Sequence, residues 1–306
     1  MNSIFTYRDE IEGKVGIGRL PNELESILDD ISKEYYNIIS DKNVSTYHTW
    51  YDDMVPSIKS KVEKIQKNDF FNKLCDGSEK CIKKNASAMD ELYYSNPKNN
   101  TKKNNLYGAT SNYDIHKDCI FNFDGIKFYR IIIGLTDNND SVKTYFNNLD
   151  VGHKINKGDY VVFDFDKTTH EVIQEKNKTT KRILLKLHYI VCENCKYSKS
   201  YVENIEKCYL WYEYITRYIM KKGTDPETFF EFFFGLGCQY FYTQYIQYII
   251  LFIIITTIIA IKFLFKIKLV YKNISKIIKY ILLSLTSIYL LVVIFYWIRY
   301  QLLGIR

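Results

Sequence analysis

The last quarter of the chain contains two long stretches without a charged residue, at 232–261 and 280–298. The hydrocarbon core of a bilayer is about 30 Å thick, and an apolar helix of roughly 20 residues crosses it. The segments 245–265 and 280–298 have this length, and Tyr and Trp residues stand near their ends, as interfacial anchors do. We therefore expect a two-span membrane hairpin within 232–306, with two buried helices of a soluble core as the alternative.

The charges around these stretches give conflicting predictions of orientation. Six lysines and no acid lie between the two charge-free stretches, at Lys262, Lys266, Lys268, Lys272, Lys276 and Lys279. The positive-inside rule would place this loop in the cytosol and the N-terminal domain across the membrane. The N-terminus, however, has no apolar signal segment that would export such a domain. A multi-pass membrane protein with a cytosolic N-terminal domain is the expectation, and a shallow hairpin would reconcile both signals.

Helical spacing dominates the residues before 104. Apolar residues recur every three or four positions from Leu24 to Ile38, which favours a helix within 20–66, and a second helical segment covers 54–74. The stretch 83–105 is rich in Asn and Lys and reads as a surface loop. Residues 1–104 are therefore expected to form a helical region followed by a polar loop.

The periodicity changes after residue 105. Four short runs, "GIKFYRIIIGL", "GDYVVFDFD", "HEVIQE" and "KRILLKLHYIVC", are rich in β-branched and aromatic residues and are separated by turn residues, including those at 139–150 and 156–159. This pattern is typical of an antiparallel sandwich or barrel. Residues 201–231 return to helical spacing and read as a helical linker to 232–306. The predicted class is α+β, with a β core at 105–200.

The seven cysteines suggest reduced thiols more than a disulfide framework, because their number is odd and Cys119 and Cys238 stand in apolar contexts. "CENC" at 192–195 is read as two ordinary thiols, with half a zinc site or a redox pair as alternatives. Cys75 and Cys81 would form a local bridge if the domain were luminal. The net charge of +7 includes many lysines near the spans, and no Arg-rich face predicts nucleic-acid binding.

A candidate metal site is formed by "HKD" at 116–118 and a distant histidine. His116 and Asp118 are separated by one residue, and His170 lies fifty-four positions after His116. Alternate residues of a strand project to the same side. Two imidazoles and one carboxylate on one face make the facial triad of non-haem Fe(II) sites. Arg182, on the strand after His170, has the planar fork that grips a carboxylate.

The strands around these residues resemble the aspartyl/asparaginyl β-hydroxylase family of Fe(II)/2-oxoglutarate dioxygenases, which includes membrane-bound lipid hydroxylases. The matching segments are "IHKD", "YRIIIGL", "GDYVVFDFDKTTHEVIQ" and "KRILLKL", over about residues 105–191. The resemblance implies a double-stranded β-helix (jelly-roll or cupin-like) catalytic core with flanking helices. It also implies iron ligation by His116 and His170, and binding of the 2-oxoglutarate carboxylate by Arg182 with help from Arg130.

The chain departs from that family at two positions. Several relatives have Gly where Asp118 stands, so Asp118 would either complete the triad or bind only a water. The family also has a His where Ile132 stands. Asp164 and Asp166 are candidate acceptors that orient His170. His153 and His188 are expected to be structural, and His48 to pack at a helix end or, with its aromatic neighbours, to line a substrate groove.

The activity implied is hydroxylation of an Asp- or Asn-type side chain of a polypeptide, with Fe(2+), 2-oxoglutarate and O2. Hydroxylation of a membrane lipid acyl chain is the alternative within the same chemistry, because a membrane hairpin would follow the catalytic domain. A non-catalytic cupin-like membrane protein that binds a ligand or partner is the alternative from another class, and a structural membrane anchor is a third possibility.

Overall fold

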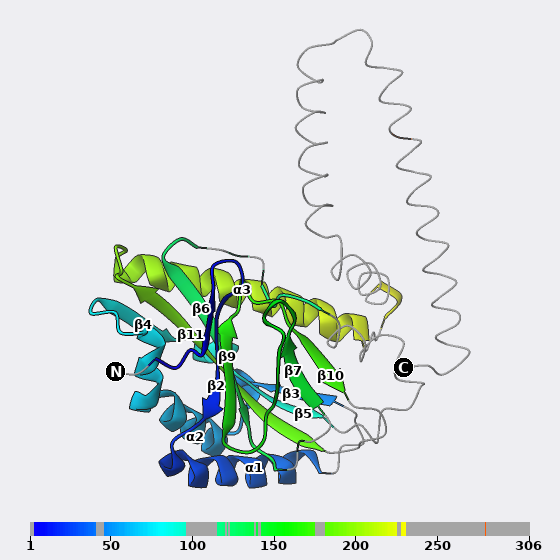
Figure 1. Cartoon of the computed structure of the whole chain (residues 1–306). Coiled ribbons are helices and arrows are strands. Elements are labelled where there is room, and N and C mark those ends of the chain that lie inside the picture. Colours follow the sequence, from blue (N-terminus) through cyan, green and yellow to red (C-terminus); the bar gives the residue numbers. More distant parts are fainter. Residues whose placement is uncertain are drawn as a thin grey trace. The chain divides into compact units, whose positions relative to one another are not determined.

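The computed structural model describes residues 3–40, 46–95, 115–119, 121, 123–137, 139, 142–174, 181–224, 228–230 and 279 (Figure 1). The chain divides into two compact units: 1–101 with 112–213, and 102–111 with 214–306. The first unit contains every strand found among the described residues. Within the described residues, no helix is long and apolar enough to span a bilayer. Both predicted spans lie outside the described residues and stay predictions.

Two antiparallel sheets form the body of the first unit (Figure 1). The large sheet has eight strands in the order β1-β2-β9-β6-β11-β5-β3, and β4 pairs with β11 as well. The small sheet has the order β10-β7-β8. The strands are β1 Tyr7–Asp9, β2 Gly13–Arg19, β3 Thr46–Trp50, β4 Cys81–Asn85, β5 Glu91–Ser95, β6 Ile126–Gly134, β7 Val142–Phe146, β8 Val151–Lys154, β9 Asp159–Asp164, β10 Glu171–Gln174 and β11 Arg182–Glu193. Two antiparallel sheets of this kind are consistent with a jelly-roll core.

An apolar layer joins the two sheets. Phe146 of β7 packs against Phe163 of β9, with ring centroids 5.6 Å apart. The cluster around them is buried and is drawn from β2, β5, β6, β9 and β11 of the large sheet as well as from the small sheet: Val15, Tyr93, Ile132, Phe146, Ile155, Val161, Phe163 and Leu184. Because side chains alternate along each strand, this layer fixes which residues of the large sheet face the small one.

Two helices pack on the opposite face of the large sheet. These are α1, Glu25–Ile39, and α2, Pro56–Gln66. Leu28 and Ile31 of α1 and Val62 of α2 are fully buried in one cluster with alternate residues of β6 and β11. The apolar stripe read from the sequence therefore packs as an amphipathic helix should. The third helix, α3, covers Lys199–Thr224, and the 3-10 turns are 22–24, 51–53, 69–75, 87–89 and 147–149.

The four predicted strand runs became β6, β9, β10 and β11, and the predicted helix after residue 201 became α3. The description of residues 1–104 as helical was wrong in part, because this region also forms β1 to β5. The composition of 83–105 predicts a polar loop, yet β5 within it is buried at all five positions. The predicted turn at 139–150 contains β7. Short strands with mixed polarity gave no clear periodicity, and the neighbouring strands stabilise them.

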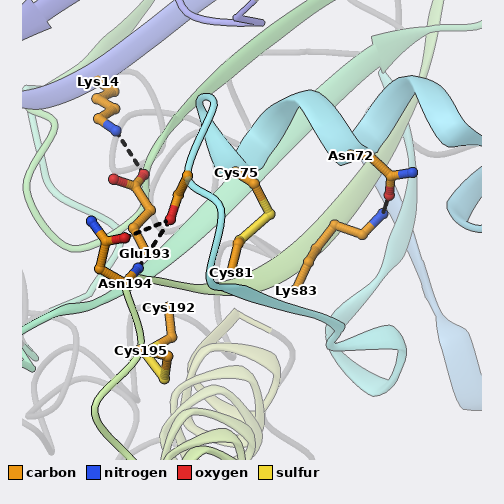
Figure 2. The surroundings of a disulfide bond; sticks show 10 residues. Lys14, Asn72, Cys75, Cys81, Lys83, Cys192, Glu193, Asn194 and Cys195 are labelled. Atoms are coloured by element: carbon orange, nitrogen blue, oxygen red, sulfur yellow. Dashed lines mark hydrogen bonds and ion pairs between the residues drawn. A yellow bond between two sulfur atoms is a disulfide. The ribbon is translucent and has the colours of Figure 1, made fainter. Parts of the chain in front are cut away.

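Two disulfide bonds correct the expectation of reduced thiols (Figure 2). Cys75 pairs with Cys81 at a Cα–Cα distance of 5.8 Å, and Cys192 pairs with Cys195 at 5.0 Å. Both separations suit a disulfide. Asn194, with φ of 48°, turns the chain between the last two cysteines. Because β4 pairs with β11 so that Cys81 lies opposite Glu193, both bonds lie at one end of this strand pair.

Candidate metal centre

His116 and His170 come together through their main chains. The N–H of His116 donates to the His170 carbonyl at 2.9 Å, and the N–H of His170 donates to the His116 carbonyl at 3.0 Å. This reciprocal pair is an antiparallel bridge, which places both side chains on the same side. The two imidazole centroids are 4.5 Å apart. Since β10 begins at the next residue, Glu171, the bridge extends the edge of the small sheet.

Asp118 completes the group. Its Oδ1 lies 3.6 Å from His116 Nε2, and its Oδ2 lies 3.7 Å from His170 Nε2. One ligand atom from each of the three residues falls within 4.8 Å of the others. Adjacent ligands of an octahedral ion with bonds near 2.1 Å would be about 3 Å apart, so a small adjustment closes the three atoms around a divalent cation. The three predicted ligands therefore meet in the described structure.

The protonation of these groups suits metal binding. Burial lowers the pKa of His170 to about 4, although the Asp118 charge opposes this, so its imidazole is neutral at physiological pH. His170 Nδ1 lies 3.3 Å from the Thr168 carbonyl, which assigns the proton to Nδ1 and leaves the lone pair on Nε2. Burial alone would raise the pKa of Asp118, but the neighbouring Arg130 charge opposes this, and that pKa lies well below its usual range. Asp118 is therefore an anion.

Arg130 of β6 lies directly against Asp118. Its Nη1 is 2.7 Å from Asp118 Oδ2, and its Nη2 is 3.7 Å from Glu213 Oε1 on α3. Its Nε donates to His188 Nε2 at 2.9 Å. The guanidinium also lies over the Phe165 ring, at 4.4 Å from the centroid. Arg130 is thus held in place on several sides, and the contact that matters for the site is with the carboxylate.

Arg182 stands at the start of β11 and is only 4% exposed. Its guanidinium carbon lies 5.8 Å from the centre of the Tyr93 ring. No described acid forms an ion pair with it, and its Nε is buried without a hydrogen-bond partner. A buried guanidinium in this condition is costly unless an anion pairs with it.

The apolar layer connects Arg182 with the metal group. Leu184 lies two residues further along β11, on the same face as Arg182, and belongs to the cluster that contains Phe163. The Phe163 ring is 4.7 Å from the His170 ring. Arg182 and His170 therefore border the same layer between the sheets, where an anion bound to Arg182 would be shielded from water by apolar side chains.

The acceptor that orients His170 is the Thr168 carbonyl, in place of the predicted Asp164 or Asp166. Asp166 instead accepts a hydrogen bond from Tyr209 Oη on α3. The residue that holds the Thr168–Thr169 segment is Glu12, from the turn between β1 and β2. No motif marks Glu12, because Thr168 and Thr169, which it holds, are more than 150 residues away in sequence.

The remaining histidines lie outside the metal group. His153 is half-buried on β8, and His188 is fully buried beside Asp90. His48 was expected at a helix end; it lies in β3, within 3.1 Å of Glu91 Oε1, and its ring stacks on Trp50. The alternation of "TYHTW" is typical of a strand. The prediction of helix over 20–66 therefore missed β3.

Fold and site together define a protein of two antiparallel sheets with a His–Asp–His group suited to a divalent metal ion. No protein-family model and no curated protein matches the chain. Solved structures similar to it include three that cover little more than half of it. They are a viral collagen prolyl hydroxylase from Paramecium Bursaria Chlorella virus-1 with 2-oxoglutarate (16% identity; 53% of this chain and 90% of that one; TM-score 0.35), a Pseudomonas putida prolyl-4-hydroxylase (15%; 57% and 91%; 0.34) and HygX from Streptomyces hygroscopicus with nickel and 2-oxoglutarate (13%; 57% and 81%; 0.35). At these identities and TM-scores, the likeness assigns neither a fold nor an activity to this chain.

Proposed function

We propose that this protein is an Fe(II)- and 2-oxoglutarate-dependent dioxygenase that hydroxylates a C–H bond. The observation that carries the proposal is the meeting of His116, Asp118 and His170, with one ligand atom from each within 4.8 Å. Two imidazoles and one carboxylate on one face leave coordination positions open for other ligands. Iron(II) bound there would supply the oxidation of the substrate by O2, coupled to the decarboxylation of 2-oxoglutarate.

The residues of the chain have separate roles in this proposal. His116, Asp118 and His170 hold the metal, and Arg182 pairs with the far carboxylate of 2-oxoglutarate. Arg182 is suited to this role because it is buried and has no acidic partner among the described residues. Arg130 was expected to help bind 2-oxoglutarate; its contact with Asp118 favours a role in holding the carboxylate ligand. Phe146 and Phe163 exclude water beside His170.

For the substrate, we propose the Asp- or Asn-type side chain of a polypeptide, on the basis of the motif resemblance. A lipid acyl chain is the second candidate, and the apolar stretches at 232–261 and 280–298 favour it, because they would hold the domain at a bilayer. Assays with peptides that contain Asp or Asn, and with vesicles that contain the lipid, separate the two. The assay in which the substrate gains the mass of one oxygen atom identifies the substrate class.

The side of the membrane also becomes a proposal. Two disulfides in the first unit favour an oxidising compartment, since such bonds are rare in the cytosol. The lysines between the two apolar stretches agree, because they favour a cytosolic loop. We therefore propose the non-cytosolic side for the folded unit, in place of the cytosolic side predicted. Thiol labelling in intact cells before and after reduction tests this placement. Labelling of Cys75 and Cys192 without a reductant would contradict it.

The test of the activity uses the purified full-length chain. Mn(II) and 2-oxoglutarate together should raise its melting temperature, and anaerobic Fe(II) followed by O2 should convert 2-oxoglutarate to succinate. His116→Ala and His170→Ala should lose both effects, whereas His153→Ala is the matched control and should keep them. If the wild-type chain shows no thermal shift with metal and 2-oxoglutarate, the dioxygenase proposal is wrong. A shift without succinate, under every substrate condition, would favour the non-catalytic binding protein.

A further inference from the structure

We propose that His188, fixed by Asp90, is a positioning residue that aims Asp118 at the metal through Arg130. This inference rests on the proposed metal site, because it concerns how one of the ligands is held. Arg130 and Asp118 belong to the matching sequence segments, whereas His188 and Asp90 lie outside them. His188 lies on β11 and Arg130 opposite it on β6, whereas Asp118 lies in the segment before β6.

The hydrogen bonds determine the tautomer of His188. Arg130 Nε carries a proton at every physiological pH, so its 2.9 Å contact makes His188 Nε2 the acceptor. The proton of the neutral imidazole is then on Nδ1, which donates to Asp90 Oδ1 at 3.2 Å. The same carboxylate oxygen accepts the main-chain N–H of His188 at 2.8 Å. Asp90 therefore fixes both the position and the tautomer of the ring.

Helix α2 supports Asp90 from the other side. Gln66, the last residue of α2, donates from Nε2 to Asp90 Oδ2, and Ser87 Oγ donates to Gln66 Oε1 at 3.1 Å. Asp90 and His188 are fully buried, and Gln66 is 1% exposed. A chain of hydrogen bonds thus runs from α2 through the large sheet to the guanidinium. Buried networks of this kind keep their members in one arrangement when the donors and acceptors are matched.

The Arg130 guanidinium, held by this network, in turn orients the Asp118 carboxylate. An arginine side chain has four rotatable bonds, and its Nη atoms can turn away from a partner. Here the Phe165 ring lies under the guanidinium and His188 holds its Nε, and Nη1 lies 2.7 Å from Asp118 Oδ2 as an ion pair. Residues that contact a metal ligand, as Arg130 contacts Asp118, change metal affinity by about 10- to 100-fold when they are replaced. His188 acts through Arg130, so we assign to it the lower end of this range.

The test is a comparison of metal affinity in four full-length proteins: wild type, His188→Leu, His188→Gln and Tyr189→Phe. Leu has no acceptor for Arg130 Nε, so the Kd for Co(II) should rise about 10-fold, and the visible Co(II) absorption bands should shift. Gln supplies an acceptor oxygen and should restore most of the affinity. Tyr189→Phe is the control, because it removes a buried hydrogen bond to the Gln66 carbonyl on the other face of β11.

The outcomes separate this inference from the proposed function. If the wild-type chain binds no Co(II), the metal site itself is refuted. If the wild type binds Co(II) and His188→Leu matches it in both affinity and spectrum, the metal site stands and the positioning role of His188 is refuted. If His188→Leu does not fold, the comparison is repeated with His188→Gln and Asp90→Leu. Equal Co(II) affinities of these two variants would overturn the proposal.

Discussion

The main-chain N–H of Thr169 donates a 2.7 Å hydrogen bond to Glu12 Oε2, across 157 residues of sequence. Glu12 is 4% exposed, its Oε1 accepts from Asn148 Nδ2, and its carbonyl accepts from Thr168 Oγ1 at 2.7 Å. The turn between β1 and β2 therefore holds the residues immediately before His170. The Glu12 carboxylate accepts from three donors in all, since Thr169 Oγ1 also donates to Oε1, at 3.4 Å.

Glu12→Gln should destabilise the protein and weaken metal binding, because an amide has one acceptor atom for these three donors. We expect a loss of about 1–3 kcal/mol in the free energy of unfolding, measured by urea titration. Glu10→Gln is the control, since Glu10 is exposed in the same turn. Equal stability of the two variants would show that Glu12 does not hold the His170 segment.

Replacement of Arg182 should weaken 2-oxoglutarate binding and leave metal binding intact. Arg182→Lys keeps the charge but loses the planar fork, so the Kd for 2-oxoglutarate should rise at least about 10-fold, and Arg182→Gln should raise it further. Calorimetric titration with Mn(II) present measures both constants. Lys181→Gln, at the exposed neighbouring position, should behave as wild type. Unchanged 2-oxoglutarate affinity in Arg182→Gln would exclude Arg182 as the carboxylate partner.

Asp166 should make the stability depend on pH. Burial raises the pKa of Asp166 from 3.8 to about 7, and Asp164 contributes in the same direction, although the Tyr209 hydrogen bond opposes the rise. A carboxyl whose pKa is higher in the folded state favours folding below its unfolded pKa, and this contribution is lost as the pH rises through about 7. As the pH rises from 4 to 8, the free energy of unfolding of Asp166→Asn should increase relative to that of wild type by up to about 4 kcal/mol.

Denaturant titrations of Asp166→Asn at several pH values measure this difference. The exposed Asp124→Asn is the control and should follow the wild-type curve. Parallel curves for wild type and Asp166→Asn would mean that Asp166 is ionised in the folded protein throughout this range.

The disulfides should contribute to stability. The double variant Cys75→Ser, Cys81→Ser removes the disulfide that links the 3-10 turn at 69–75 to β4. We expect a loss of about 1–3 kcal/mol in the free energy of unfolding. Cys208→Ser, an exposed free cysteine, is the control. A reducing agent should lower the wild-type melting temperature and leave the double variant less affected. No difference between reduced and oxidised wild type would argue against both bonds.

The sequence was most informative where residues close in the chain share one role. Alternation of apolar residues identified β6, β9, β10 and β11, and three- to four-residue spacing identified α1 and α3. It failed for β3, β5 and β7, where five-residue strands depend on pairing with neighbours for their stability. The cysteine pairs were missed because disulfides depend on Cα separations that spacing along the chain does not fix.

The sequence by itself determined the candidate residues, His116, Asp118, His170 and Arg182, since the residue types and their order within strands limit the possible chemistry. Only the tertiary structure decided how they act together. The main-chain bridge brings His170 beside His116, Arg130 turns to Asp118, and Glu12 and the Asp90–His188 pair hold the two ends of the site. These contacts join residues far apart in the chain. Each depends on strand pairing and packing, which bring distant residues together, and no local pattern encodes that.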